Sequence, residues 1–176
     1  MRGDYAQIIP DISPRRAGLL AAVAALMLDQ GSKNLLLYVF HFMSLPPGEA
    51  VQVLPCFNLV MVWNPGVTFG LFAAGSQTGT YFLAGFQFIA IVALCLWLWR
   101  ARGLLLTLSI GLVIGGAIGN LIDRLVYGRV ADFFHFYVSG FDWYVFNIAD
   151  TAIVFGVAGL IYDALCGANA SGHTPA

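Results

Sequence analysis

Charged residues are scarce in this chain of 176 residues: only 10% are Asp, Glu, Lys or Arg, whereas 60% are hydrophobic. A typical soluble domain has about 25% charged and about 45–50% apolar residues. The composition therefore excludes an ordinary soluble domain and predicts an integral membrane protein that forms a single domain over residues 1–176. The net charge of −1 provides no basic excess, so we expect no nucleic-acid partner.

The chain also lacks the residue clusters of several common kinds of site. Its three cysteines stand too far apart for a C-x-x-C pair or an even disulfide framework. The three histidines form no H-E-x-x-H motif, and His135 has no second ligand at a suitable spacing, so we expect no metal. No G-x-S-x-G or P-loop motif is present. Hydrolytic chemistry, if there is any, would have to come from carboxylates.

Long hydrophobic runs are what the chain does have. Four segments are long enough to cross a bilayer, which takes about 20 helical residues. Arginines precede the first segment and fill the connection between the second and third, so these ends are expected in the cytoplasm. The sequence thus predicts an all-α membrane fold with four transmembrane helices and both termini in the cytoplasm. The four segments are approximately residues 17–40, 80–99, 103–122 and 144–165.

The two outer connections differ in character. The first, residues 41–79, has apolar, β-branched stretches at 51–54 and 57–62, separated by turn residues, which predict short strands. Residues 67–72 are expected to form a short helix on the membrane surface. The second connection, residues 123–143, is interpreted as a loop.

Several polar residues interrupt the hydrophobic segments or lie beside them. Asp150 stands inside an apolar run, and a carboxylate in such sequence is costly to keep and is functional by default. A rise of about 1.5 Å per residue places Asp29 roughly 20 Å from the inner face and Asp150 about 10 Å below the outer face. These depths coincide in a hydrocarbon layer of about 30 Å. Asn120 and Arg124 fall at the outer end of the third segment. Polar residues of three segments are therefore expected to meet near the outer leaflet.

Asp132 and Asp150 are candidates for a catalytic dyad. Two close carboxylates cannot both ionise cheaply, so the pKa of one rises and the pair holds one proton. The anionic member can activate water while the protonated member polarises a carbonyl group. The alternative is that Asp150 forms a structural ion pair with Arg124 or Lys33, and that Asp132 is only a loop residue.

Two further patterns favour structural roles. Asp29 and Lys33 stand at i and i+4, on one helix face, which predicts a salt bridge that neutralises both charges inside the membrane. Gly111, Gly115 and Gly119 recur every four residues, and small residues at this spacing let helix backbones approach closely. Such packing would hold the outer end of the third segment near the fourth.

Two asparagines allow two interpretations each. Asn64 begins an Asn-Pro-Gly sequence that ends at Gly66 and is typical of a turn, although an asparagine there could also hold a substrate backbone or orient a carboxylate. Asn147 lies three residues before Asp150 on the same helical face. It could hydrogen-bond that carboxylate or cap the helix.

Five segments together resemble the lipoprotein signal peptidase (signal peptidase II) family. Each is weak alone, but their order on a chain with four spans is highly specific. The segments are Asp-Gln-Gly-Ser-Lys at 29–33, Asn-Pro-Gly-Val-Thr-Phe-Gly at 64–70, Gly-Gly-Ala-Ile-Gly-Asn-Leu-Ile-Asp-Arg at 115–124, Gly-Arg-Val-Ala-Asp-Phe at 128–133 and Phe-Asn-Ile-Ala-Asp-Thr-Ala-Ile at 146–153.

The resemblance implies a bacterial inner-membrane aspartyl protease whose site faces the outer side. Such an enzyme removes the signal peptide of prolipoproteins just before a cysteine that carries diacylglycerol, and its partners are those substrates and membrane lipid. The resemblance assigns the dyad to Asp132 and Asp150, with Asp123 as second choice for the first role, and it implies no metal or organic cofactor. We expect a monomer. Residues that would contact substrate or brace the dyad are Asn64, Gly66, Asn120, Arg124 and Asn147.

A different class remains open on the residues alone. A small proton-coupled transporter could use Asp29, Asp132 and Asp150 as a relay. Transporters often contain internal repeats, and the two halves of this chain share none that is visible.

Overall fold

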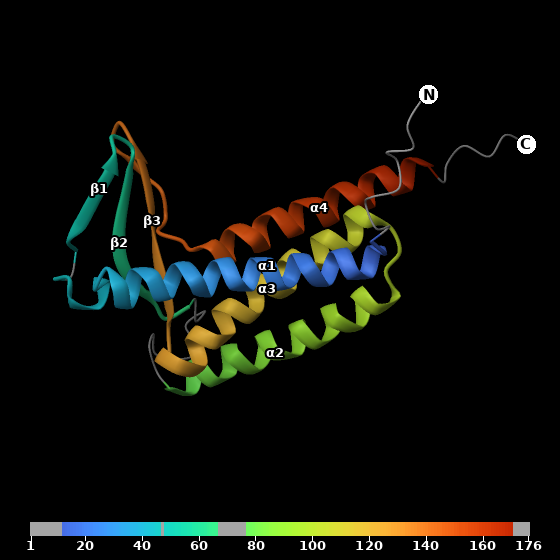
Figure 1. Ribbon diagram of the computed structural model, residues 1–176, viewed down its shortest axis with the longest axis horizontal. Helices are drawn as coiled ribbons and strands as arrows, with labels where there is room; N and C mark the ends of the chain where they lie inside the picture. The colour runs from blue at the N-terminus through green and yellow to red at the C-terminus, as the bar shows by residue number, and fades with distance from the viewer. Residues whose placement is uncertain (1–11, 47, 67–76, 171–176) are drawn as a thin grey trace, which may run out of the picture.

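The computed structural model describes residues 12–46, 48–66 and 77–170. Four long helices lie side by side, and a small sheet stands at one end of them (Figure 1). The surface helix expected at residues 67–72 lies outside the described residues. The helical elements are α1 (Pro14–Asn34), a π-helical turn η1 (Leu35–Val39), a 3-10 turn η2 (Phe42–Ser44), α2 (Gln77–Arg100), α3 (Leu104–Tyr127) and α4 (Ile148–Ala170); the strands are β1 (Ala50–Leu54), β2 (Phe57–Asn64), β3 (Val130–Val138) and β4 (Phe141–Asp142).

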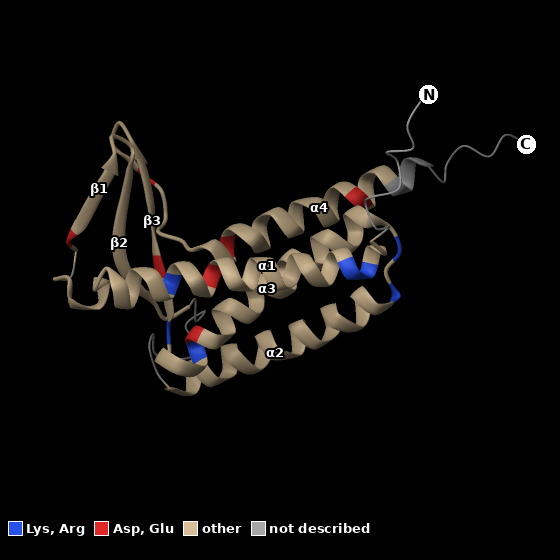
Figure 2. Ribbon diagram, viewed as in Figure 1, with Lys and Arg blue, Asp and Glu red and all other residues tan. Residues whose placement is uncertain are grey.

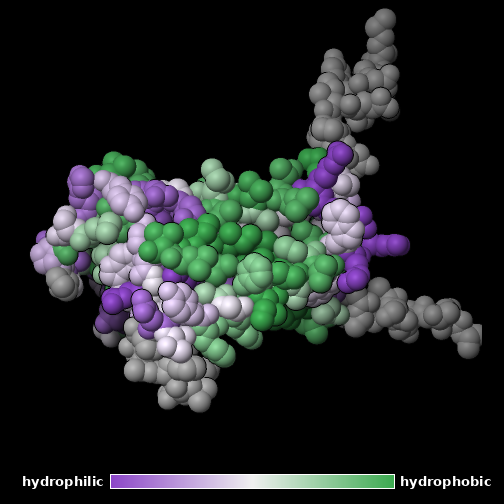
Figure 3. All heavy atoms as spheres, turned by 90° about the horizontal axis from the view of Figure 1, so that it is seen from below, coloured by the Kyte–Doolittle hydropathy of each residue, from purple (hydrophilic) through white to green (hydrophobic). Residues whose placement is uncertain are grey.

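Three of the described helices are long and apolar enough to cross a membrane: α2, α3 and Ile148–Cys166 of α4. Helix α1 is not among them, because its second half carries Asp29, Gln30 and Lys33. The π-helical turn continues α1 as far as Val39. On the face shown in Figure 3, an apolar zone covers the middle of the bundle and polar residues lie toward its ends. The helical membrane architecture expected from the sequence is therefore present.

Helix α3 forms the centre of the bundle. In the 18-residue apolar stretch of α3, 61% of the residues are buried inside the protein. In the corresponding stretches of α2 and α4, only 17% are buried. Glycines make this possible: a methyl group at Gly111 or Gly115 would overlap the α1 backbone at Gly18 or Ala22, and one at Gly116 would overlap the carbonyl of Ala149 in α4. The expected close packing of the face with Gly111, Gly115 and Gly119 is confirmed, but its partner is α1 and not the fourth helix, which instead packs against α3 at Gly116.

The sheet is antiparallel with strand order β1-β2-β3-β4. Strands β1 and β2 come from the first outer connection, as expected, but β3 and β4 come from the second, which was wrongly interpreted as a loop. The signal was present, because β3 is rich in aromatic and β-branched residues. The fold is mostly helical with a small antiparallel sheet, as expected, but two of the four described strands come from a connection where none was anticipated.

Two helix ends also differ from expectation. Helix α3 runs five residues past residue 122, to Tyr127, where Gly128 with φ of 71° provides a left-handed C-cap. Asp123 thus belongs to the helix and not to the connection that follows it. Helix α4 begins at Ile148 and not at 144, because Phe146 instead pairs with Phe134 of β3.

Charged residues lie at both ends of the bundle. Some basic residues gather away from the sheet, where α1 begins and α2 connects to α3, and others lie near the sheet beside acidic residues (Figure 2). Most acidic residues lie toward the sheet or at its junction with the helices, while one is near the far end of α4. The junction between bundle and sheet is where the sequence-predicted site residues meet.

Candidate active site

Asp132 lies on β3 and is 1% exposed. Its Oδ2 accepts a hydrogen bond from Asn64 Nδ2 at 3.0 Å, and its Oδ1 accepts one from Asn147 Nδ2 at 2.6 Å. The pKa of Asp132 is raised to about 6, mainly because burial removes the carboxyl group from water. The negative charge of Asp150 also raises the pKa, whereas the hydrogen bonds from Asn64 and Asn147 and the positive charge of Lys33 lower it. Asp132 is therefore a carboxyl group that can gain and lose a proton near neutral pH.

Asp150 lies in the first turn of α4 and is half-buried. Its backbone N–H donates to Asn147 Oδ1 at 2.9 Å, and its Oδ2 accepts the Asn147 backbone N–H at 3.3 Å. This reciprocal arrangement is a capping box, in which each side chain satisfies a free N–H of the helix start. Of the two interpretations of Asn147, the helix cap is confirmed; the Asp150 carboxylate is contacted by the backbone N–H of Asn147 and not by its side chain.

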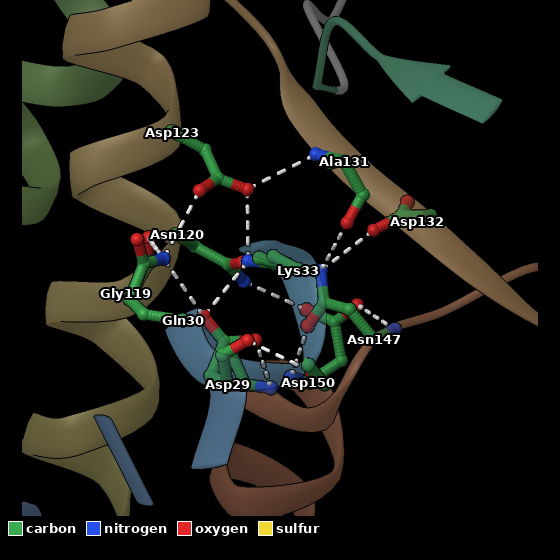
Figure 4. Close-up of polar contacts among 12 residues, drawn as sticks. Asp29, Gln30, Lys33, Gly119, Asn120, Asp123, Ala131, Asp132, Asn147 and Asp150 are labelled. Atoms are coloured by element: carbon green, nitrogen blue, oxygen red, sulfur yellow. Dashed lines mark hydrogen bonds and ion pairs between the residues drawn. The ribbon is translucent and has the colours of Figure 1, made fainter. Parts of the chain in front are cut away.

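Two asparagines connect the carboxylates (Figure 4). Asn120 of α3 donates through Nδ2 to Asp150 Oδ1 at 2.8 Å. Asn120 Oδ1 accepts a hydrogen bond from Asn147 Nδ2 at 3.1 Å. Asn147 Nδ2 also donates to Asp132 Oδ1. Asp132 and Asp150 therefore share one hydrogen-bonded network. Within the described residues, neither aspartate has a Lys or Arg nitrogen within 4 Å, so the ion pair considered as an alternative does not form.

The chain segment before α4 explains how Asn147 reaches Asp132. Phe146 pairs with β3, where its carbonyl accepts from the backbone N–H groups of Phe133 and Phe134 at 3.1 and 2.9 Å. This pairing places the next residue beside the strand position of Asp132. The start of α4 is thereby fixed to the sheet.

The salt bridge expected between Asp29 and Lys33 is confirmed, with Nζ and Oδ2 2.9 Å apart. It is part of a larger group, because Lys33 Nζ also lies 2.8 Å from Asp123 Oδ2 and donates to Asn120 Oδ1 at 3.1 Å. Asp123, the second choice for the dyad, is 1% exposed and pairs with the lysine. The lysine thus has two carboxylate partners where the sequence predicted one.

Sequence reasoning missed Gln30. Its Nε2 contacts Asp29 Oδ2 at 3.2 Å, Asp123 Oδ1 at 3.1 Å and the Gly119 carbonyl at 3.2 Å. A methyl group at Gly119 would overlap Asp29 Oδ2, so this glycine leaves space for the carboxylate. The available signal was an amide next to a buried charge in a hydrophobic segment.

The remaining predicted residues form the edge of the site nearest α2. Arg124 Nη1 donates to Gln87 Oε1 at 2.9 Å and to the Asn120 carbonyl at 3.3 Å. Gly66 N–H donates to Asn64 Oδ1 at 2.8 Å, and Gly66 has φ of 83°, which favours glycine. A Cβ atom there would lie 2.7 Å from Leu83 and 3.6 Å from Arg124. The turn at Asn64 and its contact with a carboxylate are both present.

The arrangement suits acid-base chemistry on a carbonyl group. Two carboxyl groups in one network, one of them deeply buried, can hold a single proton between them. The described residues contain no group of three His, Cys, Asp or Glu arranged to hold a metal ion. The polar groups that meet at this junction are carboxyl groups and amides, together with Lys33 and Arg124.

Comparisons with known proteins identify the family of this chain. The sequence profile of the family described as "Signal peptidase (SPase) II" matches residues 21–166. A "Lipoprotein signal peptidase" of Rhodopseudomonas palustris is 50% identical over 160 residues, which is 89% of this chain and 96% of that protein. A protein of the same name from Beijerinckia indica is 45% identical over 164 residues, 93% of this chain and 96% of that protein.

A solved structure described as "Bacterial membrane enzyme structure by the in meso method at 2.3 A resolution" has the same fold. It superposes with a TM-score of 0.71 at 27% identity and covers 90% of this chain and 93% of that chain. The resemblance drawn from the five sequence segments is confirmed. Because the family profile matches most of its length, the chain belongs to the signal peptidase II family of peptidases.

Proposed function

We propose that this peptidase is an aspartic endopeptidase that removes the signal peptide of prolipoproteins, cutting before a diacylglyceryl-modified cysteine. The observation that carries the proposal is the network in which Asn147 contacts Asp132 at 2.6 Å and forms a capping box with Asp150. The ionised carboxyl group removes a proton from water, and the protonated one donates a hydrogen bond to the scissile carbonyl. The resulting hydroxide attacks the carbonyl carbon, and a proton passes to the amide nitrogen as the C–N bond breaks.

The asparagines and Arg124 support this chemistry. Asn64 and Asn147 each donate to Asp132, which favours its ionised form and limits the rise of its pKa. Arg124 lies beside Gly66 and Gln87 at the edge of the network, where its guanidinium group can bind the carbonyl oxygens of an extended peptide. Gly66 keeps this edge open, because a side chain there would meet Leu83.

The proposed enzyme spans the bacterial inner membrane four times, with α1 and its π-helical turn as the first span. Arg15 and Arg16 lie at the start of α1, and Arg100 and Arg102 lie where α2 connects to α3; both places are away from the sheet, which supports placing those ends, and both termini, in the cytoplasm. The sheet and the dyad then lie toward the outer face, where a lipid anchor would hold the substrate.

Purified protein tests the proposal with a diacylglyceryl-modified prolipoprotein and with its unmodified precursor. We expect rapid cleavage of the lipidated form only, with the lipid-bearing cysteine as the new N-terminus in mass spectra. Asp132→Asn and Asp150→Asn should each abolish cleavage while the protein stays folded, because Asn cannot act as a general base. Turnover by either variant at the wild-type rate would refute the dyad. Inhibition by a metal chelator would refute a mechanism that uses carboxyl groups alone.

The transporter considered from the sequence has no support from the family to which the chain belongs. The aspartates expected to form its relay, Asp29, Asp132 and Asp150, all lie at one end of the bundle, at its junction with the sheet.

A further inference from the structure

Lys33 lies between two carboxylates in the interior of the bundle. Its Nζ is 2.9 Å from Asp29 Oδ2 and 2.8 Å from Asp123 Oδ2, and its side chain is 3% exposed. Gln30 Nε2 contacts the same two carboxylates from a second direction. One cation and one amide thus set the spacing between a carboxylate of α1 and a carboxylate of α3.

Each of these carboxylates also holds one backbone N–H group elsewhere in the site. Asp123 Oδ2 accepts the N–H of Ala131 at 3.0 Å, and Asp29 Oδ1 accepts the N–H of Ala149 at 2.9 Å. Ala131 and Ala149 are both 0% exposed. They are the residues immediately before the two aspartates of the proposed dyad, so each carboxylate anchors the backbone that carries one of them (Figure 4).

A third contact of Lys33 orients an amide. Asn120 Oδ1 accepts from Lys33 Nζ and from Asn147 Nδ2, both at 3.1 Å. With its oxygen directed at these donors, the Asn120 side chain presents Nδ2 to Asp150 Oδ1 at 2.8 Å. Lys33 therefore acts on Asp150 through the backbone and through a side chain.

We propose that Asp29, Lys33 and Asp123 are positioning residues that fix the separation of Asp132 and Asp150. This proposal rests on the proposed function, because it takes those two aspartates as the dyad. Asp132 stands on a strand and Asp150 on a helix, and the ion group ties the backbones of both to one lysine. A structural role alone explains the group poorly, since buried ion pairs are often no more stabilising than well-packed apolar residues.

The test uses variants that keep the protein folded. Lys33→Arg keeps the charge but changes the spacing, and the triple variant Asp29→Asn, Lys33→Met, Asp123→Asn leaves no buried charge unpaired. We expect kcat for lipidated substrate to fall about 10- to 100-fold in both, because displacements near 1 Å can cost about 100-fold in rate. KM should stay within about twofold, since none of these side chains needs to contact the substrate.

Thr107→Val is the matched control, because Thr107 is buried in α3 and its hydroxyl bonds only to carbonyls of its own helix, Gly103 and Leu104. It should lower thermal stability and leave kcat per folded molecule unchanged. Wild-type kcat per folded molecule in Lys33→Arg and in the triple variant would overturn the proposal. Wild-type enzyme and Asp132→Asn are measured in the same assay. Cleavage by wild type and none by Asp132→Asn would show that the proposed function holds and that only the positioning proposal has failed.

Amide hydrogen exchange gives a readout that needs no activity. Lys33→Met should accelerate exchange at Ala131 and Ala149 together, because one lysine holds both anchoring carboxylates. Asp123→Asn should act mainly at Ala131. Exchange at both alanines that is unchanged in Lys33→Met would overturn the proposal.

Discussion

Replacement of Asn147 can separate the stability of the site from its chemistry. Asn147 caps α4 through Oδ1, which accepts the Asp150 N–H, and its Nδ2 donates to Asp132 Oδ1 at 2.6 Å. Asn147→Ser keeps a capping oxygen but removes the amide donor, whereas Asn147→Ala removes both. Serine and asparagine cap helices about equally well, and replacement of such a cap by alanine costs about 1 kcal/mol.

The lost donor should lower both the rate and the melting temperature, whereas the lost cap should lower only the melting temperature. A hydrogen bond to a charged group contributes about 1.5–3 kcal/mol, and each 1.4 kcal/mol corresponds to about a factor of ten. We therefore expect Asn147→Ser to melt between wild type and Asn147→Ala, while kcat/KM for lipidated prolipoprotein falls about 10- to 150-fold. Asn147→Ala should show a similar loss of rate and a lower melting temperature.

Two assays on the same preparations decide the question. Thermal melting in detergent reports the cap, and cleavage of lipidated substrate followed by mass spectrometry reports the chemistry. If Asn147→Ser cleaved as fast as wild type, the contact with Asp132 would have no part in catalysis. If it melted as low as Asn147→Ala, the capping argument would be wrong.

Two further predictions concern stability. The pKa of Asp132 is about 6 in the folded protein and near 3.8 when unperturbed, so the folded state holds the proton more tightly. Wild type should therefore lose stability relative to Asp132→Asn, on the order of 3 kcal/mol, as pH rises from about 4 to about 6. Melting temperatures of the two proteins that change in parallel across that range would contradict this. Gly119→Ala should destabilise by about 1–3 kcal/mol, because its methyl group would overlap Asp29 Oδ2, whereas Gly31→Ala, with open space around its Cβ, should melt at or slightly above the wild-type temperature.

The sequence predicted the meeting of polar residues better than it predicted the elements that carry them. Helix rise placed Asp29 and Asp150 at one level, and both do meet Asn120 at the junction of bundle and sheet. The depth of Asp150 was nevertheless overestimated, because it assumed a helix from residue 144 and α4 begins at Ile148, with Asp150 in its first turn. The same residues also formed the segments that resemble the family.

The strands of the second outer connection were missed because their apolar residues reflect pairing in a sheet and not the crossing of a membrane. Strand β3 is apolar since it pairs with β2 on one side and with β4 and Phe146 on the other, and such pairing is not local in sequence. Asp123 was expected in the connection because the third segment was ended at residue 122, whereas α3 continues to its C-cap at Gly128. Its true partners, Lys33 and the Ala131 N–H, lie on separate elements.

The contact between Ala149 and Asp29 has a consequence for the synthesis of this protein. It joins residues 120 positions apart, so the second anchor of the site has no partner until α4 has been made. Under the proposed mechanism, a chain with only α1 to α3 inserted lacks Asp150 and therefore has no dyad. Activity would then begin only when the last helix docks against the other three.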